Sequence, residues 1–228
     1  MKKMLSIIIL AIIIQGTNAY AQSTETRRFS ALQLHSGYIM PQINTLPGGF
    51  TANSGMVGIG TSGYGSLGKR WLIGGSGFGT IAHSSAINDV TTTTDMGMGF
   101  ADIGYLLHNK GRWISHVYAG IGGGGMTITY ENRGESALRI ADNLSVDNGD
   151  RIKISAGGLA WQTGLSVSRL LFDPAAQSGG WKIGLDLGVF QFPYFSQWKY
   201  TGNDRGLQGA DRPQLWGGVA RLNIGIVF

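Results

Sequence analysis

The chain has 228 residues, of which 38 are glycine, none is cysteine and only 14% are charged. The length allows a single domain, and the lack of cysteine excludes both a disulfide-stapled fold and a lipid anchor on an N-terminal cysteine. The formal net charge of +5 falls to +3 without the two lysines near the N-terminus, and the other basic residues are scattered at segment ends. A nucleic-acid partner is therefore not expected. High glycine together with 10% aromatic residues favours strands over helices.

The N-terminal stretch has the three parts of a secretory signal. Two lysines precede the apolar run Leu5–Ile14, and Ala19 and Ala21 form a small-x-small cleavage site. We therefore expect a cleavable signal peptide over residues 1–21 and a mature chain over residues 22–228. The alternative, an uncleaved anchor, is disfavoured because about ten apolar residues are too few to span a bilayer as a helix. No later segment is long and apolar enough either, so a membrane-spanning product must be a barrel.

Eight strand-like segments divide the mature chain. They are predicted at Arg28–Met40, Met56–Leu67, Trp71–His83, Thr94–His108, Trp113–Tyr130, Ile154–Leu171, Trp181–Gln197 and Gln214–Phe228. Three of the connections are short and rich in glycine. The other four are long and polar, at Pro41–Gly55, Ser84–Thr93, Glu131–Lys153 and Trp198–Pro213. This alternation predicts an all-β, eight-stranded antiparallel up-and-down transmembrane β-barrel with short turns and both termini in the periplasm.

The longest connection, Glu131–Lys153, carries five acidic and four basic residues. It has no bulky apolar cluster in its sequence, and its tip is predicted to be a solvated hairpin with a turn at Gly149. No metal or cofactor site is predicted in the chain.

The last segment has the clearest alternation. Residues at even positions from Trp216 to Phe228 form an apolar face, whereas the odd positions include Arg221 and Asn223. In a membrane barrel the apolar face meets lipid and the polar face lines the lumen. An apolar strand that ends at an aromatic residue resembles the C-terminal β-signal recognised by the barrel-assembly machinery, with Phe228 as its last residue.

The six tryptophans fall at two levels of the predicted barrel. One group opens strands directly after short turns, namely Trp71, Trp113 and Trp181. The other lies near the long-loop ends, namely Trp161, Trp198 and Trp216. Two levels of tryptophan predict aromatic girdles at the two membrane interfaces, whereas a soluble sandwich would bury most of them in mid-strand.

Alternation also predicts which side chains face lipid and which face the lumen on other strands. Outward positions are predicted for the aliphatic and aromatic residues of three further strands: Leu32, Leu34, Tyr38, Leu159, Trp161, Leu165, Val167, Trp181, Ile183, Leu185, Leu187 and Val189. The third and fourth strands are too rich in glycine to orient.

Four ionisable residues lie deep in strands at similar heights: His35, Asp102, Asp186 and Arg221. We expect them to form a polar network that fills the lumen, because a buried charge without a partner is costly. A narrow path for protons or small solutes is the alternative reading of the same residues.

One catalytic arrangement is present in the sequence. His83 lies two residues before Ser85, and Asp95 lies across the second loop. The pair weakly resembles the His-x-Ser element of outer-membrane lipid A deacylases, which are also eight-stranded barrels. This sequence departs from that family because Ala86 follows the serine where an asparagine is expected, and no glutamate lies nearby. Ordinary polar contacts are the favoured interpretation, and a lipid A-directed hydrolase remains the alternative.

The whole mature chain resembles the small outer-membrane β-barrel family of Gram-negative bacteria, the OmpA- and OmpX-like barrels. The resemblance implies a monomer in the outer membrane, in contact with its lipids and lipopolysaccharide and inserted by the barrel-assembly machinery. It does not imply one activity, since barrels of this kind serve as anchors, adhesins, channels and enzymes. The predicted role is structural, or one of surface interaction through the long extracellular loops.

Overall fold

The computed structural model describes residues 30–43, 46–49, 55–81, 83–87, 89–171, 180–202 and 205–228. The predicted signal peptide lies outside these ranges. In the part of the chain that is described, no helix is long and apolar enough to cross a membrane.

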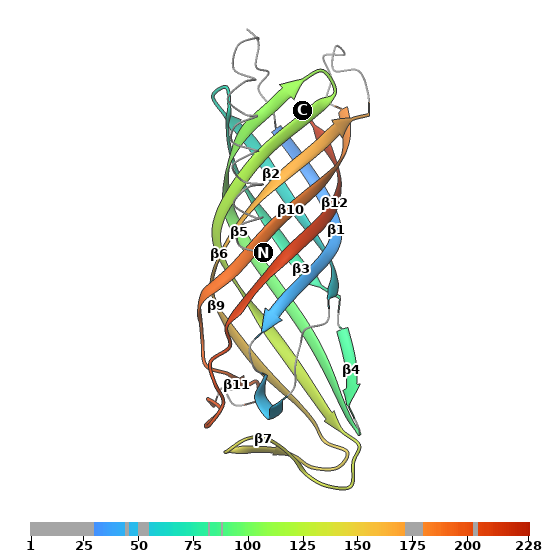
Figure 1. Ribbon diagram of the computed structural model, residues 1–228, viewed down its shortest axis with the longest axis vertical. Coiled ribbons are helices and arrows are strands. Elements are labelled where there is room, and N and C mark those ends of the chain that lie inside the picture. Colours follow the sequence, from blue (N-terminus) through green and yellow to red (C-terminus); the bar gives the residue numbers. More distant parts are fainter. Residues whose placement is uncertain are drawn as a thin grey trace, which may run out of the picture.

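Eight long strands form a closed antiparallel barrel within the described ranges (Figure 1). In chain order they are β1 (Ser30–Ile43), β2 (Met56–Leu67), β3 (Trp71–Thr80), β5 (Val90–Lys110), β6 (Trp113–Asn132), β9 (Arg151–Leu170), β10 (Gly180–Phe195) and β12 (Leu215–Val227). Each pairs with its neighbours in the chain, and β12 closes the ring on β1. The predicted up-and-down topology is therefore confirmed.

Short elements lie beyond the long-connection end of the barrel. They are the 3-10 turn η2 (Pro47–Gly49) and the strands β4 (His83–Ile87), β7 (Leu138–Ala141), β8 (Leu144–Val146) and β11 (Lys199–Tyr200). At the opposite end, Gly68 and Gly111 form tight turns with φ of 73° and 59°, values that a glycine adopts without strain. The C-terminus lies at this short-turn end (Figure 1).

The strand register fixes the width of the barrel. A row of paired residues that starts at Ala31 returns to the same strand at Pro41, ten residues further on, by way of Tyr64, Gly74, Asp102, Gly120, Gln162, Phe190 and Gly217. With ~3.3 Å rise per residue and ~4.8 Å between strands, this stagger corresponds to a tilt of about 40° and a backbone radius of about 8 Å. A barrel this narrow has room for side chains and little else.

The barrel wall has an apolar outside and a mixed inside. The exposed large side chains include those predicted to face outward on β1, β9, β10 and β12, such as Leu34, Leu159, Ile183 and Leu222. Their sequence neighbours Gln33, Ala160, Lys182 and Arg221 are buried. The structure also orients the two glycine-rich strands, since Ile73 and Ile103 are exposed whereas Phe78, Phe100 and Asp102 are buried.

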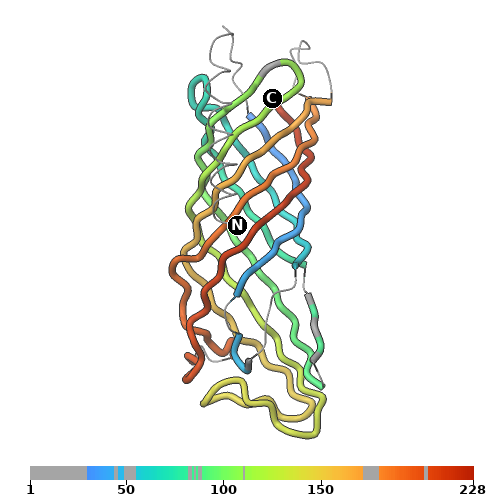
Figure 2. Tube along the Cα trace, viewed as in Figure 1, coloured from blue at the N-terminus to red at the C-terminus, as the bar shows by residue number. Residues whose placement is uncertain are grey.

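Three strands are longer than the sequence predicted. β5, β6 and β9 have 20 or 21 residues, against 10 and 12 in β3 and β2. They continue past the long-connection end as a projecting sheet, to which β4 adds a further strand (Figure 2). The threonines of β5, at positions 91–94, favour strand through their β-branched side chains although they show no alternation of polarity.

Candidate functional site

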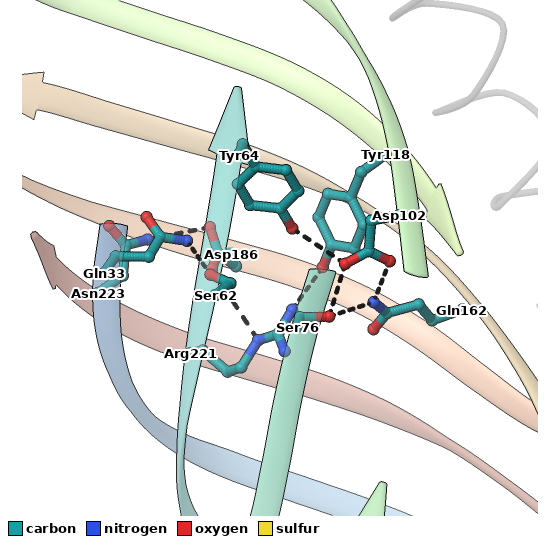
Figure 3. Close-up of polar contacts among 10 residues, drawn as sticks. All are labelled: Gln33, Ser62, Tyr64, Ser76, Asp102, Tyr118, Gln162, Asp186, Arg221 and Asn223. Atoms are coloured by element: carbon teal, nitrogen blue, oxygen red, sulfur yellow. Dashed lines mark hydrogen bonds and ion pairs between the residues drawn. The ribbon is translucent and has the colours of Figure 1, made fainter. Parts of the chain in front are cut away.

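The lumen contains a cluster of buried polar side chains near the middle of the barrel (Figure 3). Asp102 on β5 accepts hydrogen bonds from Ser76 Oγ at 2.7 Å, from Gln162 Nε2 at 2.7 Å and from Tyr64 OH at 3.4 Å. Gln162 Nε2 also lies 2.8 Å from Ser76 Oγ. Four strands thus meet at one carboxylate, and two short hydrogen bonds compensate its removal from water.

A second group surrounds Arg221. Its Nη2 donates to Tyr118 OH at 2.7 Å across the lumen, and its Nε lies 4.0 Å from Asp186 Oδ2. Asp186 stands directly opposite Arg221 in the β10–β12 pairing and also accepts a 3.0 Å hydrogen bond from Asn223 Nδ2. All four residues are buried (Figure 3). The ion pair is therefore fixed by strand register and removed from solvent.

His35 joins the Arg221 group through its ring. It stacks on Phe78 with a centroid separation of 5.7 Å, and the guanidinium carbon of Arg221 lies 6.0 Å from the same phenyl ring. Of the four residues expected to form one network, the structure places Asp186, Arg221 and His35 together. Asp102 belongs to the neighbouring group, bonded to Ser76 and Gln162.

Sequence reasoning did not name the neutral partners of these charges. Most of the hydrogen bonds drawn in Figure 3 involve Tyr64, Ser76, Tyr118, Gln162 and Asn223. The inward position of Gln162 and Asn223 follows from alternation on β9 and β12, but which residues meet across the lumen depends on the stagger of the whole barrel.

Two lumen glycines make space for the polar cluster. A Cβ added at Gly120 would collide with Asp102 Oδ1, and one at Gly164 would collide with Tyr118 OH. On the outside of the barrel the situation is the opposite. A Cβ at Gly99 would find its nearest heavy atom, Ser76 O, at 3.8 Å. Glycine is thus required by packing on the lumen side of these strands and is optional at Gly99.

Apolar side chains fill the lumen between the polar cluster and the long-connection end of the barrel. Ile39, Phe78, Phe100, Phe190 and Val219 are buried and belong to one continuous hydrophobic cluster. The void between this layer and the polar groups has a volume of about 10 Å³, which is room for one water molecule at most. A smaller apolar layer, comprising Ala31, Tyr64, Leu72, Leu106 and Ile114, lies towards the short-turn end.

The described parts of the long connections pack together into a lid over the long-connection end of the barrel. Ile140 and Val146 of the β7–β8 hairpin and Leu207 are buried in the same cluster as the lumen residues. Tyr130 OH donates to the carbonyl of Pro47 at 2.8 Å, which ties β6 to η2. The predicted solvated tip is confirmed, since residues 147–150 are exposed and Gly149 turns with φ of 81°. Isolated aliphatic residues elsewhere in the connection converge on one core, which the sequence did not predict.

Hydrogen bonds join the hairpin to the last connection. Asp142 N donates to Gln208 O at 3.0 Å, Asn143 Nδ2 donates to Gly206 O at 3.1 Å, and Gln208 N donates to Asn143 Oδ1 at 2.9 Å. Two segments about 65 residues apart are thus held by three bonds.

Five of the six tryptophans lie on the outside of the barrel. Trp71, Trp113 and Trp181 are half-exposed at the short-turn end. Trp161 and Trp216 lie on either side of Gln191 in one row of paired residues near the other end. Ten residues separate Trp181 from Gln191, or about 25 Å along the barrel axis at a tilt of ~40°, which is the height of a lipid-facing apolar band.

The girdle prediction is wrong for Trp198. Its side chain is 0% exposed and packs in the hydrophobic cluster under the lid. The chain has already left the barrel wall at Trp198, because β10 ends at Phe195. The next strand, β11, pairs with β9 beyond the long-connection end of the barrel.

The residues of the weak catalytic alternative lie on the paired strands β4 and β5. β4 pairs with β5 so that the Cα partners of His83 and Ser85 are Thr94 and Thr92. Asp95 follows Thr94 in the strand and therefore lies on the opposite face of the sheet from both threonines. The side chains of His83 and Ser85 lie outside the described part of the structure.

The last residue, Phe228, lies at the seam of the barrel. Its backbone N donates to Ser30 O at 3.0 Å, and Ser30 N donates to Phe228 O at 3.2 Å. Its ring is 69% exposed on the outer wall.

Solved structures with a similar fold are outer-membrane proteins. Ail, the attachment invasion locus protein of Yersinia pestis, in complex with the heparin analogue sucrose octasulfate, aligns with a TM-score of 0.53 and 12% identity over 89% of this chain and 99% of Ail. A second structure of Ail aligns with a TM-score of 0.51 and 12% identity over 87% of this chain and 99% of that one. The outer-membrane protease OmpT of Escherichia coli gives 0.40 and 11% over 92% and 99% of the chains.

No family model and no curated protein sequence matches this chain. The Ail alignments cover nearly the whole of both chains, and at this identity they establish the fold alone. Together with the apolar outer wall, they show that the chain has the fold of a small transmembrane β-barrel. The expected fold class is thereby confirmed.

Proposed function

We propose that this protein is a closed outer-membrane barrel with a structural or surface-interaction role. The lid and the projecting ends of β5, β6 and β9 together form a folded surface, here called the platform, which the barrel presents outside the cell. The observation that carries the proposal is the continuous apolar cluster running from the lumen residues Phe78 and Phe190 to Trp198 and Val146 in the lid. We expect a lumen packed in this way to lack a continuous water-filled path, so a channel role is disfavoured.

The proposed orientation puts the short turns and both termini in the periplasm and the lid outside. Short turns on the periplasmic side and longer extracellular connections are usual for bacterial barrels. Phe228 at the barrel seam also fits recognition by the barrel-assembly machinery from the periplasm. We expect a monomer in contact with outer-membrane lipids and lipopolysaccharide.

The surface of the platform carries balanced charge. Its described residues include seven basic and eight acidic ones: Arg133, Arg139, Arg151, Lys153, Lys199, Arg205 and Arg212, against Asp89, Asp95, Glu131, Glu135, Asp142, Asp147, Asp150 and Asp211. Several are neutralised locally, as in the Arg133–Glu131 and Arg139–Asp142 pairs. Balanced charge of this kind does not favour a highly sulfated ligand such as the one bound to Ail. A partner whose surface is polar and uncharged, or of mixed charge, fits better.

Planar-bilayer recording tests the closed lumen. Purified protein, reconstituted at the protein-to-lipid ratio that gives clear openings for a general porin, is expected to give no stable conductance steps. Regular openings from the folded, heat-modifiable form would contradict the proposal.

The orientation is tested by cysteine labelling in whole cells, because the natural chain contains no cysteine. A membrane-impermeant maleimide should label Arg139→Cys in intact cells. Lys69→Cys in the short turn should react only after the outer membrane is permeabilised.

A further inference from the structure

Charge is distributed very unevenly along the barrel axis. Among the described residues at the short-turn end, Lys69, Arg70, Lys110, Arg112 and Arg169 are basic and none is acidic. The acidic residues of the described ranges lie either in the lumen or on the platform. The described part of the short-turn rim is therefore cationic, whereas the described part of the platform is close to neutral.

The rim cations lie on one sector of the barrel. Arg70 precedes β3, Arg112 lies in the turn between β5 and β6, and Arg169 is on β9. The strands β3, β5, β6 and β9 are consecutive neighbours in the sheet. The described rim positions on β10, β12 and β1 carry no basic residue in their first two positions at this end. Among the described residues of this rim, the positive charge is thus concentrated on the β3–β9 side.

Two of these arginines lie against the lipid-facing wall. Arg70 Nη1 donates to Tyr105 OH at 3.2 Å, and the Tyr105 ring meets Trp71 edge-on at 5.2 Å between centroids. The guanidinium carbon of Arg169 lies 5.8 Å from the centre of the Trp113 ring. Trp71 and Trp113 are both about half-exposed on the outer wall. Each guanidinium is therefore held beside an interfacial aromatic ring, at the height of lipid headgroups.

We infer that this rim is a binding site for the phosphate groups of anionic phospholipids in the periplasmic leaflet. A guanidinium offers several donors in a plane and matches phosphate oxygens in a bidentate way. The adjacent indole rings occupy the same interface, so one lipid molecule meets a cation at its headgroup and an aromatic ring beside its glycerol. The inference rests on the proposed orientation, which places this rim in the periplasmic leaflet.

The site discriminates by net charge of the lipid. A zwitterionic headgroup brings its own ammonium, which the rim cations repel, whereas phosphatidylglycerol brings only the phosphate. Basic residues near a membrane surface each favour anionic lipid by about 1 kcal/mol, which corresponds to roughly fivefold in binding. The guanidiniums of Arg70 and Arg169 are the strongest contributors because their aromatic neighbours restrict them to the wall.

Competition between lipids in the bilayer tests the inference. The full-length barrel is reconstituted in phosphatidylcholine with brominated chains, which quench tryptophan fluorescence on contact. Unbrominated phosphatidylglycerol is then added, and the recovery of fluorescence gives its binding relative to phosphatidylcholine. We expect a preference of at least fivefold for phosphatidylglycerol, which falls towards one in 1 M KCl because salt screens the attraction.

Matched charge variants locate the effect. The triple variant Arg70→Gln, Arg112→Gln and Arg169→Gln should reduce the preference to about one. A control that removes three exposed platform arginines, Arg133, Arg139 and Arg151, in the same way should keep it. The inference is overturned by a wild-type ratio near one, by a preference that survives the rim substitutions, or by equal losses in both triple variants. Labelling of Lys69→Cys in intact cells would instead overturn the orientation, and the lipid preference of the rim would be unaffected by that result.

Discussion

The lumen packing can be tested by adding a single methyl group on either side of the barrel wall. Gly120 on β6 stands directly opposite Asp102 on β5 and faces the lumen. A Cβ there would collide with the Asp102 carboxylate, and it would also lie 3.0 Å from the backbone O of Ala101. Gly99 on β5 faces lipid, and an added Cβ finds no heavy atom closer than 3.8 Å. Gly120→Ala is the perturbation, and Gly99→Ala is its matched control.

The expected cost follows from the hydrogen bonds that Asp102 would have to give up. Its two 2.7 Å bonds, from Ser76 and Gln162, are charge-assisted, and each contributes about 1.5–3 kcal/mol. A displaced carboxylate would retain part of this, so Gly120→Ala should destabilise the barrel by about 3 kcal/mol. The entropy that alanine removes from the unfolded chain is common to both variants and cancels in the comparison. Gly99→Ala should lie within about 0.5 kcal/mol of wild type.

Urea unfolding in lipid vesicles, followed by tryptophan fluorescence, measures both free energies of unfolding. The unboiled and boiled mobilities on a denaturing gel show whether each variant is a closed barrel. Equal stability of the two alanine variants would refute the account of the lumen, because it would mean that Asp102 is free to move without loss.

Three further outcomes are expected. Arg221→Met leaves buried Asp186 without its cation and should cost about 3–5 kcal/mol in the same unfolding assay. Combining it with Asp186→Leu should cost less than the sum of the single changes by about 1–3 kcal/mol, and strict additivity would contradict the ion pair. Trp198→Ala should open the lid and make the platform sensitive to protease added to intact cells, because a fully buried indole is replaced by a cavity. Trp161→Ala, on the lipid-facing wall, should leave the protease pattern unchanged, and equal sensitivity in both variants would argue against a packed lid.

The sequence alone determined the class of the protein and the orientation of half of its wall. On the first and last strands, Leu34 and Leu222 face lipid while Gln33 and Arg221 face inward, as alternation predicted. This prediction succeeds because every second side chain of a strand lies on the same face of the sheet. The polarity of each such set therefore indicates whether its face meets lipid or the lumen. Tight turns at Gly68 and Gly111 were visible for a similar local reason.

The tertiary structure alone decided which side chains meet across the lumen and where the chain leaves the membrane. Arg221 reaches Tyr118, 103 residues away, and Asp102 is bonded to Gln162 and Ser76 rather than to the arginine. These partners depend on a stagger of ten residues around the closed ring, a quantity that no single strand contains. Trp198 was misplaced because its indole is held by a core assembled from separate connections, and local periodicity carries no information about such convergence.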